Sequence, residues 1–270
     1  MKKFLASLGL SVVLASSLFA DTLMMATTTS TEDTGLLDYL APQFEKQTGT
    51  TLKWVSTGTG KALKMGENCD VDVLLVHAPD AEKKFVDAGF GVDRNEVMYN
   101  DFVIIGPKSD PANVSGKTTA EAFKIIKEKN ANFLSRGDNS GTHQKELSMW
   151  EKVSKIVPEK DIWYVQTGQG MIATINMASE KGGYTLTDRG TWIKYESQKG
   201  ESNNMKIIVE NDNVLFNQYS VITVNKDKCP NVKTQLAKDF TNWMIKDETQ
   251  KLIGDFKLLE KPLFTPNAKK

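Results

Sequence analysis

Cysteine and histidine are both scarce in this 270-residue chain, which has only two of each. Cys69, Cys229, His77 and His143 lie far apart in the sequence, so they lack the short spacing that marks a zinc site. The sequence therefore predicts no bound metal cation. In an oxidising compartment, two cysteines can form one disulfide or stay as two buried thiols, and the sequence leaves both alternatives open.

An excess of charge of either sign is also absent. The chain has 34 Lys plus Arg and 34 Asp plus Glu, with no long run of basic residues. A nucleic-acid surface needs many cationic contacts to phosphate, so nucleic acid is not expected as a partner. With 40% apolar residues, the chain has an ordinary globular composition and is long enough for one large domain or two lobes of roughly 100–150 residues.

Only one long uncharged run occurs, and it stands at the start of the chain. Lys2 and Lys3 precede an apolar stretch from 4 to 19, and Ala20 offers a cleavage point before Asp21. This is the pattern of a secretory signal peptide, and the stretch is short for a membrane span. We therefore expect residues 1–20 to be a signal peptide removed near Ala20, and the remainder to be a soluble periplasmic protein.

Short apolar runs alternate with segments of helical periodicity along the rest of the chain. In the first half, three strand-to-helix units follow one another, which implies a parallel sheet with right-handed crossovers. The second half repeats the pattern. The predicted strands are 22–26, 51–56, 71–76, 101–106, 133–134, 162–165, 184–186 and 218–225.

Two of these strands, 101–106 and 218–225, are expected to connect separate lobes. If the chain leaves the first lobe along one strand and returns along the other, lobe one is 21–105 plus 219–270 and lobe two is 106–218. The predicted fold class is α/β, with two doubly wound lobes joined by a two-strand hinge, as in type II periplasmic binding proteins that close over a ligand. A single continuous sheet is the alternative.

Two predicted strand-to-helix loops in the first half are rich in hydroxyl groups or glycine. In open α/β sheets, ligands bind beyond the carboxyl ends of the strands, where helix N-termini point. Thr27–Thr31 is a run of five hydroxyl residues, and Ser56–Lys61 contains glycines at 58 and 60. The second loop lacks the first Gly and the last Ser or Thr of a nucleotide P-loop. Hydroxyls and backbone N–H groups at a positive helix end favour anion binding, with an ordinary exposed turn as the alternative.

The loop 135–143, in the second half, has the richest chemistry in the chain. It offers Arg136, the hydroxyls of Ser135, Ser140 and Thr142, and the start of a new helix. Arginine is a natural counter-charge for a small oxyanion, because its planar fork donates several charge-assisted hydrogen bonds. We expect Asp138 to face away from an anion, capping the helix or orienting the arginine. An arginine on a solvated turn is the alternative.

Ser140 and His143 raise the alternative of a serine hydrolase. The two residues lie three apart at one helix start, from which a base seldom reaches across a nucleophile, and no Gly-x-Ser-x-Gly motif exists. The sequence therefore predicts a protein that is not an enzyme and has no catalytic residue. His143 is expected behind the site or on the surface.

Two further segments, 166–171 and 185–191, also follow predicted strands and open helices. Gly168 and Gly170 in the first segment could add backbone donors or serve only as turn residues. In the second segment, Asp188 and Arg189 are predicted to form a structural ion pair rather than to contact a ligand.

Four stretches of the sequence strongly resemble the TupA-type family, the periplasmic tungstate-binding proteins of tungstate ABC importers. The likeness runs from the signal peptide to the C-terminal helices, and the cysteine pair is not a recognised part of it. The four stretches are ATTTSTEDTG at 26–35, GTGKAL at 58–63, DVDVLLVHAP at 70–79 and SRGDNSGTH at 135–143.

This resemblance implies a monomeric two-lobe protein without a cofactor. The protein would hold one tungstate dianion between its lobes, with molybdate as an alternative ligand, and deliver it to an ABC transporter permease with its ATPase. The ligand set implied by the matching motifs is Thr28, Thr29, Ser30, Gly58 and Thr59 on one lobe and Ser135, Arg136, Ser140, Gly141 and Thr142 on the other.

The residues alone predict less than the resemblance does. Hydroxyls, helix ends and one arginine would suit sulfate, phosphate, molybdate or tungstate, so the choice of tungstate rests on the resemblance. A secreted hydrolase and a surface adhesion or sensor protein are the alternatives to a transport binding protein.

Overall fold

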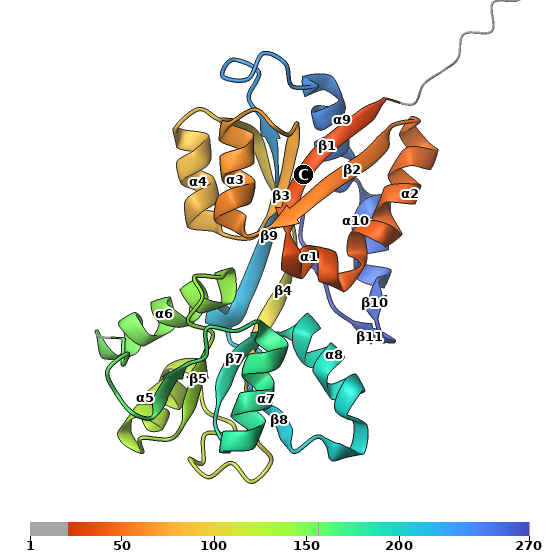
Figure 1. The fold of residues 1–270 in the computed structure, drawn as a ribbon. Coiled ribbons are helices and arrows are strands. Elements are labelled where there is room, and N and C mark those ends of the chain that lie inside the picture. Colours follow the sequence, from red (N-terminus) through yellow and green to blue (C-terminus); the bar gives the residue numbers. More distant parts are fainter. Residues whose placement is uncertain (1–20, 156, 270) are drawn as a thin grey trace, which may run out of the picture.

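The computed structural model describes residues 21–155 and 157–269, so the predicted signal peptide lies outside the described residues. Two lobes stand one above the other in Figure 1, joined by long strands that run between them. No helix within these two ranges is both long and apolar enough to cross a membrane.

Lobe one is built on a sheet with strand order β2-β1-β3-β9-β4-β12. The first three strands are parallel to one another, as predicted, whereas β9 runs antiparallel to β3 and to β4. Figure 1 shows α3 and α4 on one side of this sheet and α2, α9 and α10 on the other. The bounds are β1 (Thr22–Thr28), β2 (Thr51–Thr57), β3 (Val73–Val76), β4 (Gly91–Pro107), β9 (Phe216–Val224), β12 (Thr265–Pro266), α2 (Leu36–Thr48), α3 (Thr59–Glu67), α4 (Pro79–Asp87), α9 (Thr234–Met244) and α10 (Asp247–Asp255).

Burial explains why these segments form the predicted elements. Every residue of β3 is buried, as expected for a central strand covered on both faces. The helical periodicity of Leu36, Leu37, Leu40 and Phe44 forms the buried face of α2. That helix ends at Gly49, whose φ of 73° is in the left-handed region that glycine adopts without strain.

Lobe two packs its helices around the far end of β4 with its paired strands and around one two-stranded sheet. Strands β7 and β8 pair antiparallel with β4, while β5 and β6 form a parallel pair. Figure 1 shows α7 and α8 on one side of this lobe and α5 and α6 on the other. The bounds are β5 (Phe133–Ser135), β6 (Tyr164–Gln166), β7 (Thr185–Asp188), β8 (Met205–Val209), α5 (Thr119–Glu128), α6 (Gly141–Ser154), α7 (Met171–Lys181) and α8 (Arg189–Lys199).

The long strand β4 passes from one lobe into the other. Its residues up to Asp101 pair with β9 of lobe one, and its residues from Phe102 pair with β7 and β8 of lobe two. The chain returns where β9 begins, at Phe216. On this pairing, we propose lobe boundaries at 101/102 and 215/216, a few residues before the boundaries at 105/106 and 218/219 that the sequence suggests.

A disulfide joins Cys69 and Cys229, whose Cα atoms are 5.3 Å apart. Cys69 follows α3, and Cys229 follows β9 and is fully buried among apolar side chains of lobe one. The bond therefore links the two separate chain segments from which lobe one is built. Of the two alternatives that the sequence leaves open, the cysteines therefore form a disulfide and are not two buried thiols.

Candidate oxyanion-binding site

The carboxyl ends of three parallel strands bring three loops of lobe one to one edge of its sheet. Thr28 of β1 lies opposite Thr57 of β2, and Thr27 lies opposite Leu75 of β3. The loops that follow these strands therefore leave the sheet side by side. The short helix α1 (Thr29–Thr34) begins here and lies on the side of lobe one that faces lobe two (Figure 1).

Thr28 is the N-cap of α1, and its hydroxyl is the centre of a hydrogen-bond cluster. Thr28 Oγ1 accepts from the backbone N–H of Thr31 at 3.2 Å. It also lies 2.7 Å from Thr31 Oγ1 and 3.1 Å from Ser30 Oγ. Thr28 is buried, Ser30 is half-buried and Thr29 is exposed. The predicted hydroxyl loop is therefore an organised helix start rather than a plain surface turn.

The second predicted loop forms another helix start at the same edge. Gly58 is the N-cap of α3, and Thr59 is the first residue of that helix and is half-buried. The first backbone N–H groups of a helix have no partner within it and carry a partial positive charge. Thr29 and Ser30 on α1 offer the same kind of donor, so all five predicted residues of lobe one lie at helix N-termini of one sheet edge.

His77 also lies at this edge, although the sequence predicts no role for it. It follows β3, and its Nε2 lies 3.0 Å from both Thr28 Oγ1 and Ser30 Oγ. Its Nδ1 lies 3.0 Å from Asn217 Oδ1, and its ring packs on that of Tyr219 with centroids 4.7 Å apart. Burial lowers the pKa of His77 below its usual 6.5, against the opposing effects of Asn217 and the Asp188 carboxylate.

Lobe two contributes the loop between β5 and α6. Ser140 is the N-cap of α6 and accepts from the backbone N–H of His143 at 3.3 Å, and Gly141 and Thr142 are the first two helical residues. Arg136 donates from a terminal nitrogen to Asp138, whose other oxygen accepts from the backbone N–H of Ser140 at 3.1 Å. Asp138 therefore orients the arginine, the second of the two roles that the sequence predicts for it, whereas the N-cap of the helix is Ser140.

Arg136 Nε in this loop is buried without a hydrogen-bond partner among the described residues. The Arg136 side chain is 20% exposed, so part of the guanidinium still reaches solvent. A buried donor without a partner is costly, and such atoms mark places where a ligand can complete the hydrogen bonding.

The N-terminus of α6 in lobe two lies close to the loop of lobe one that contains His77. A Cβ added to Gly141 would lie 3.6 Å from Cε1 of His77, which places the N-terminus of α6 directly against the loop that follows β3. Gly141 of lobe two therefore lies close to the same histidine that contacts Thr28 and Ser30 of lobe one.

The segment 166–171 supports the arginine loop from behind. The backbone N–H of Thr167 donates to the carbonyl of Ser135, and that of Gly168 donates to the carbonyl of Arg136, both at 2.9 Å. Gly168 has a φ of 63°, and Gly170 is the N-cap of α7. Gly168 is therefore a turn residue, the second of the two readings that the sequence leaves open for it.

The predicted pairing of Asp188 with Arg189 is wrong. Arg189 forms ion pairs with Asp101 of β4 and with Glu210, which follows β8. Asp188 instead caps α8 by accepting from the backbone N–H and the hydroxyl of Thr191 at 2.8 and 2.7 Å. An N-cap carboxylate has its oxygens turned toward the helix start, so the adjacent arginine is free to reach across the sheet.

The hydrolase alternative finds no support in the geometry at α6. His143 is buried, and its Nδ1 accepts from the backbone N–H of Asn139 at 3.0 Å. Ser140 Oγ is occupied by the backbone N–H of His143 rather than by its ring. Within residues 21–155 and 157–269, no cluster of His, Cys, Asp and Glu could hold a metal ion.

A buried carboxylate lies one helical turn behind His143, in the core of lobe two. Glu146 is 2% exposed, and its Oε1 accepts from Tyr164 Oη at 2.6 Å and from Trp150 Nε1 at 2.9 Å. Burial raises the pKa of Glu146 to about 7, against the hydrogen bonds of Ser135, Tyr164 and Trp150. Below about pH 7 the folded protein therefore holds a proton on Glu146, which the unfolded chain releases at pH values above about 4.5.

This proton makes stability fall as the pH rises. The stabilisation that the proton on Glu146 contributes is complete below about pH 4.5, the pKa of this group in the unfolded chain. It is lost as the pH rises through about 7, its pKa in the folded protein. Glu146→Gln keeps an acceptor oxygen but does not titrate, so between about pH 5 and about pH 8 the variant should lose about 1–3 kcal/mol less stability than wild type. Urea unfolding at the two pH values measures the difference. Equal losses in both proteins would contradict the prediction.

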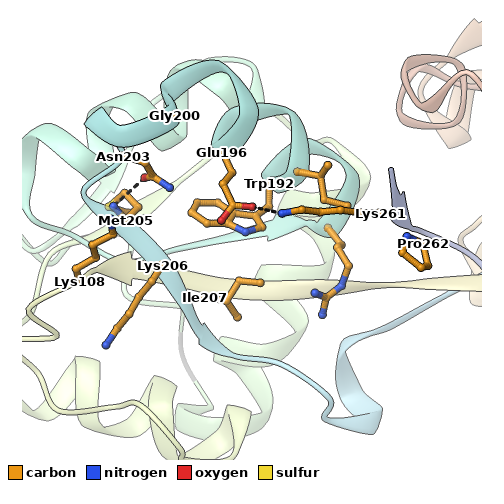
Figure 2. Close-up of a pocket in the computed structure, with 12 residues that line it drawn as sticks. Lys108, Trp192, Glu196, Gly200, Asn203, Met205, Lys206, Ile207, Lys261 and Pro262 are labelled. Atoms are coloured by element: carbon orange, nitrogen blue, oxygen red, sulfur yellow. Dashed lines mark hydrogen bonds and ion pairs between the residues drawn. The ribbon is translucent and has the colours of Figure 1, made fainter. Parts of the chain in front are cut away.

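A separate cavity of about 600 Å³ lies away from these loops, between α8, β8 and the C-terminal segment (Figure 2). Trp192 and Ile207 form part of its wall, and the ion pair of Glu196 with Lys261 lies across it. None of the ten predicted site residues lines this cavity. The candidate oxyanion site therefore lies at the loops around His77 and not in this cavity.

Comparison with known proteins places the chain in a family. Residues 16–248 match the family described as "PBP superfamily domain". The chain is also 53% identical over 240 residues to the tungstate-binding protein TupA of Campylobacter jejuni subsp. jejuni serotype O:2, and the match covers 89% of each chain. The chain belongs to the TupA family of the PBP superfamily. The resemblance stated from the four sequence stretches is thereby confirmed.

Solved structures agree with this assignment to the TupA family. The tungstate-binding protein TupA from Desulfovibrio alaskensis G20 has a TM-score of 0.89 and 65% identity, covering 93% of this chain and 100% of the other. A tungstate ABC transporter structure from Geobacter sulfurreducens has a TM-score of 0.75 and 49% identity, covering 87% and 98%. The α/β binding-protein fold is confirmed, and these TupA relatives are binding proteins rather than enzymes.

Proposed function

We propose that this protein captures a tungstate dianion between its two lobes and delivers it to an ABC importer. The observation that supports the proposal is the closeness of Gly141, at the start of α6, to His77: a Cβ added to Gly141 would lie 3.6 Å from the His77 ring, and that ring lies 3.0 Å from the hydroxyls of Thr28 and Ser30. Helix N-termini, hydroxyls and a guanidinium are the donors that a small oxyanion requires. The names of the relatives supply the choice of tungstate, with molybdate as a second ligand.

In this proposal each lobe holds half of the donor set. Contacts of the anion with the second lobe exist only when the lobes are closed, so ligand binding shifts the protein toward the closed form. The proposed ligand residues are Thr28, Thr29, Ser30, Gly58 and Thr59 on lobe one and Ser135, Arg136, Ser140, Gly141 and Thr142 on lobe two.

We further infer that the protein is exported by the signal peptide at 1–20, acts as a monomer in the periplasm and docks on a permease with its ATPase. The structure from Geobacter sulfurreducens is described as a tungstate ABC transporter, which supports this partner. The disulfide supports an oxidising compartment.

Calorimetric titration of the ligand-stripped chain from residue 21 onward tests the proposal. We expect tight one-to-one binding of tungstate, weaker binding of molybdate, and no response to sulfate or phosphate. Equal binding of sulfate would overturn the choice of tungstate but keep an oxyanion site. Silence with all four anions would overturn the function.

A further inference from the structure

His77 lies at the centre of the proposed site but belongs to none of its predicted donor groups. It contacts the hydroxyls of Thr28 and Ser30 at the start of α1 and the β9 residues Asn217 and Tyr219, and it lies close to the N-terminus of α6. Its position decides what protons the neighbouring hydroxyls can give to an anion.

The hydrogen bonds around Asn217 determine which ring nitrogen of a neutral His77 carries the proton. The Asn217 amide nitrogen donates to Asn100 Oδ1 at 2.8 Å, so Asn217 Oδ1 is left as an acceptor for Nδ1 of His77. With its proton on Nδ1, a neutral ring presents a lone pair at Nε2. That lone pair faces the hydroxyls of Thr28 and Ser30, each 3.0 Å away.

A neutral His77 therefore competes with an anion for hydroxyl protons. Each hydroxyl has one proton to donate, and the one that points at Nε2 cannot point into the cleft. A proton on Nε2 reverses this relation, because the ring then donates to a hydroxyl oxygen. The ring then no longer competes with the anion for the hydroxyl protons, and a positive charge is added to the site.

The groups around His77 favour a second proton on its ring only when an anion is bound. In the structure, burial and the positive N-terminal end of the 14-residue α6 oppose a charge on His77. The titratable groups that face the ring are the Asp188 carboxylate, which favours the charged form, and Tyr219, which is neutral with its pKa raised by burial. A bound dianion adds a much closer negative charge.

We propose that His77 is a positioning residue of the oxyanion site that takes up one proton from solvent at Nε2 when the anion binds, turning the hydroxyls of Thr28 and Ser30 toward the ligand. The inference rests on the proposed function. It makes affinity depend on pH, because binding that takes up one proton tightens by up to about tenfold for each unit that the pH falls.

Proton uptake can be measured directly. Tungstate is titrated into the protein at about pH 7.5 in imidazole and in Tris buffer, two cationic buffers that ionise with different enthalpies. The dependence of the observed heat on the buffer gives the number of protons bound. We expect a clear fraction of one proton for wild type and none for His77→Gln, with weaker binding by the variant. His143→Gln is the matched control, because it removes the only other histidine and should leave the proton uptake in place.

A second measurement uses the unaltered protein and is independent of how the variants fold. The ring signals of only two histidines must be assigned by nuclear magnetic resonance. Without ligand, His77 should be the neutral form protonated at Nδ1, and added tungstate should convert it to the doubly protonated ring. Tungstate binding with no proton uptake and an unchanged neutral ring would overturn the inference while the proposed function stands. No binding of tungstate at all would overturn the proposed function itself.

Discussion

Arg136→Ala should weaken tungstate binding by at least about 30-fold. The guanidinium is mostly buried, and one of its nitrogens, Nε, has no partner among the described residues, so it is available to an anion in the cleft. Removing it also leaves the Asp138 carboxylate without its counter-charge beside the ligand. Loss of one partner from a buried charge pair costs about 2–5 kcal/mol, which corresponds to affinity reduced by roughly 30-fold to several thousand-fold. Calorimetric titration measures this loss.

Three further variants separate the causes of that loss. Arg136→Lys keeps the charge but loses the planar fork, so its affinity should lie between those of wild type and Arg136→Ala. Asp138→Asn added to Arg136→Ala should recover part of the affinity, since it removes the repelling carboxylate. Lys124→Ala removes a positive charge from an exposed position of α5 in the same lobe and should bind as wild type does. Wild-type affinity in Arg136→Ala would remove this arginine from the site.

The sequence predicts most of lobe one but misses half of the strand that joins the lobes. Alternation of apolar runs with helical periodicity is a local signal, and it locates β1, α2, β2 and β3 to within a few residues. β4 was expected over 101–106 and in fact spans Gly91–Pro107. Its first half contains the charged residues Arg94 and Glu96, which in sequence are typical of a loop. In the structure Arg94 pairs with Glu96 and with the buried Glu82 of α4. The pairing with Glu82 depends on the tertiary structure, so the local sequence does not reveal it.

In the candidate site, too, the sequence predicts features with a local pattern and misses those that depend on distant residues. Glycine-rich and hydroxyl-rich loops after predicted strands located the starts of α3 and α6 correctly, because helix starts have a local signature. The separate helix α1, over Thr29–Thr34, was not predicted, since this segment was expected to be a loop before the helix containing Leu36. His77 was missed although it directly follows a predicted strand, a signal that could have placed it at the same sheet edge. The partners of Arg189 are 88 and 21 residues away in sequence, so no local pattern could have identified them.

Removing the Cys69–Cys229 disulfide should produce the largest loss of stability. The bond closes a loop across 160 residues that contains the whole of lobe two, and it joins the two segments of lobe one. In the chain-entropy account, cross-links that close longer loops restrict the unfolded state more, which gives an upper value of about 5 kcal/mol here. Urea unfolding of the protein with and without a thiol reductant measures the effect, with unfolding of lobe one expected at lower urea after reduction.

The variant Cys69→Ser/Cys229→Ala distinguishes loss of the bond from other effects of the reductant. Alanine suits the apolar surroundings of the buried Cys229, and serine suits the exposed Cys69. The variant should be as unstable as the reduced wild type and should not respond to reductant. Because the bond lies after α3 and β9 rather than at the loops around His77, tungstate affinity of the folded variant should stay within about twofold of wild type. Unchanged stability on reduction would contradict the prediction. It would mean that the two segments of lobe one stay together in the unfolded ensemble without the bond, so that the cross-link hardly restricts the unfolded chain.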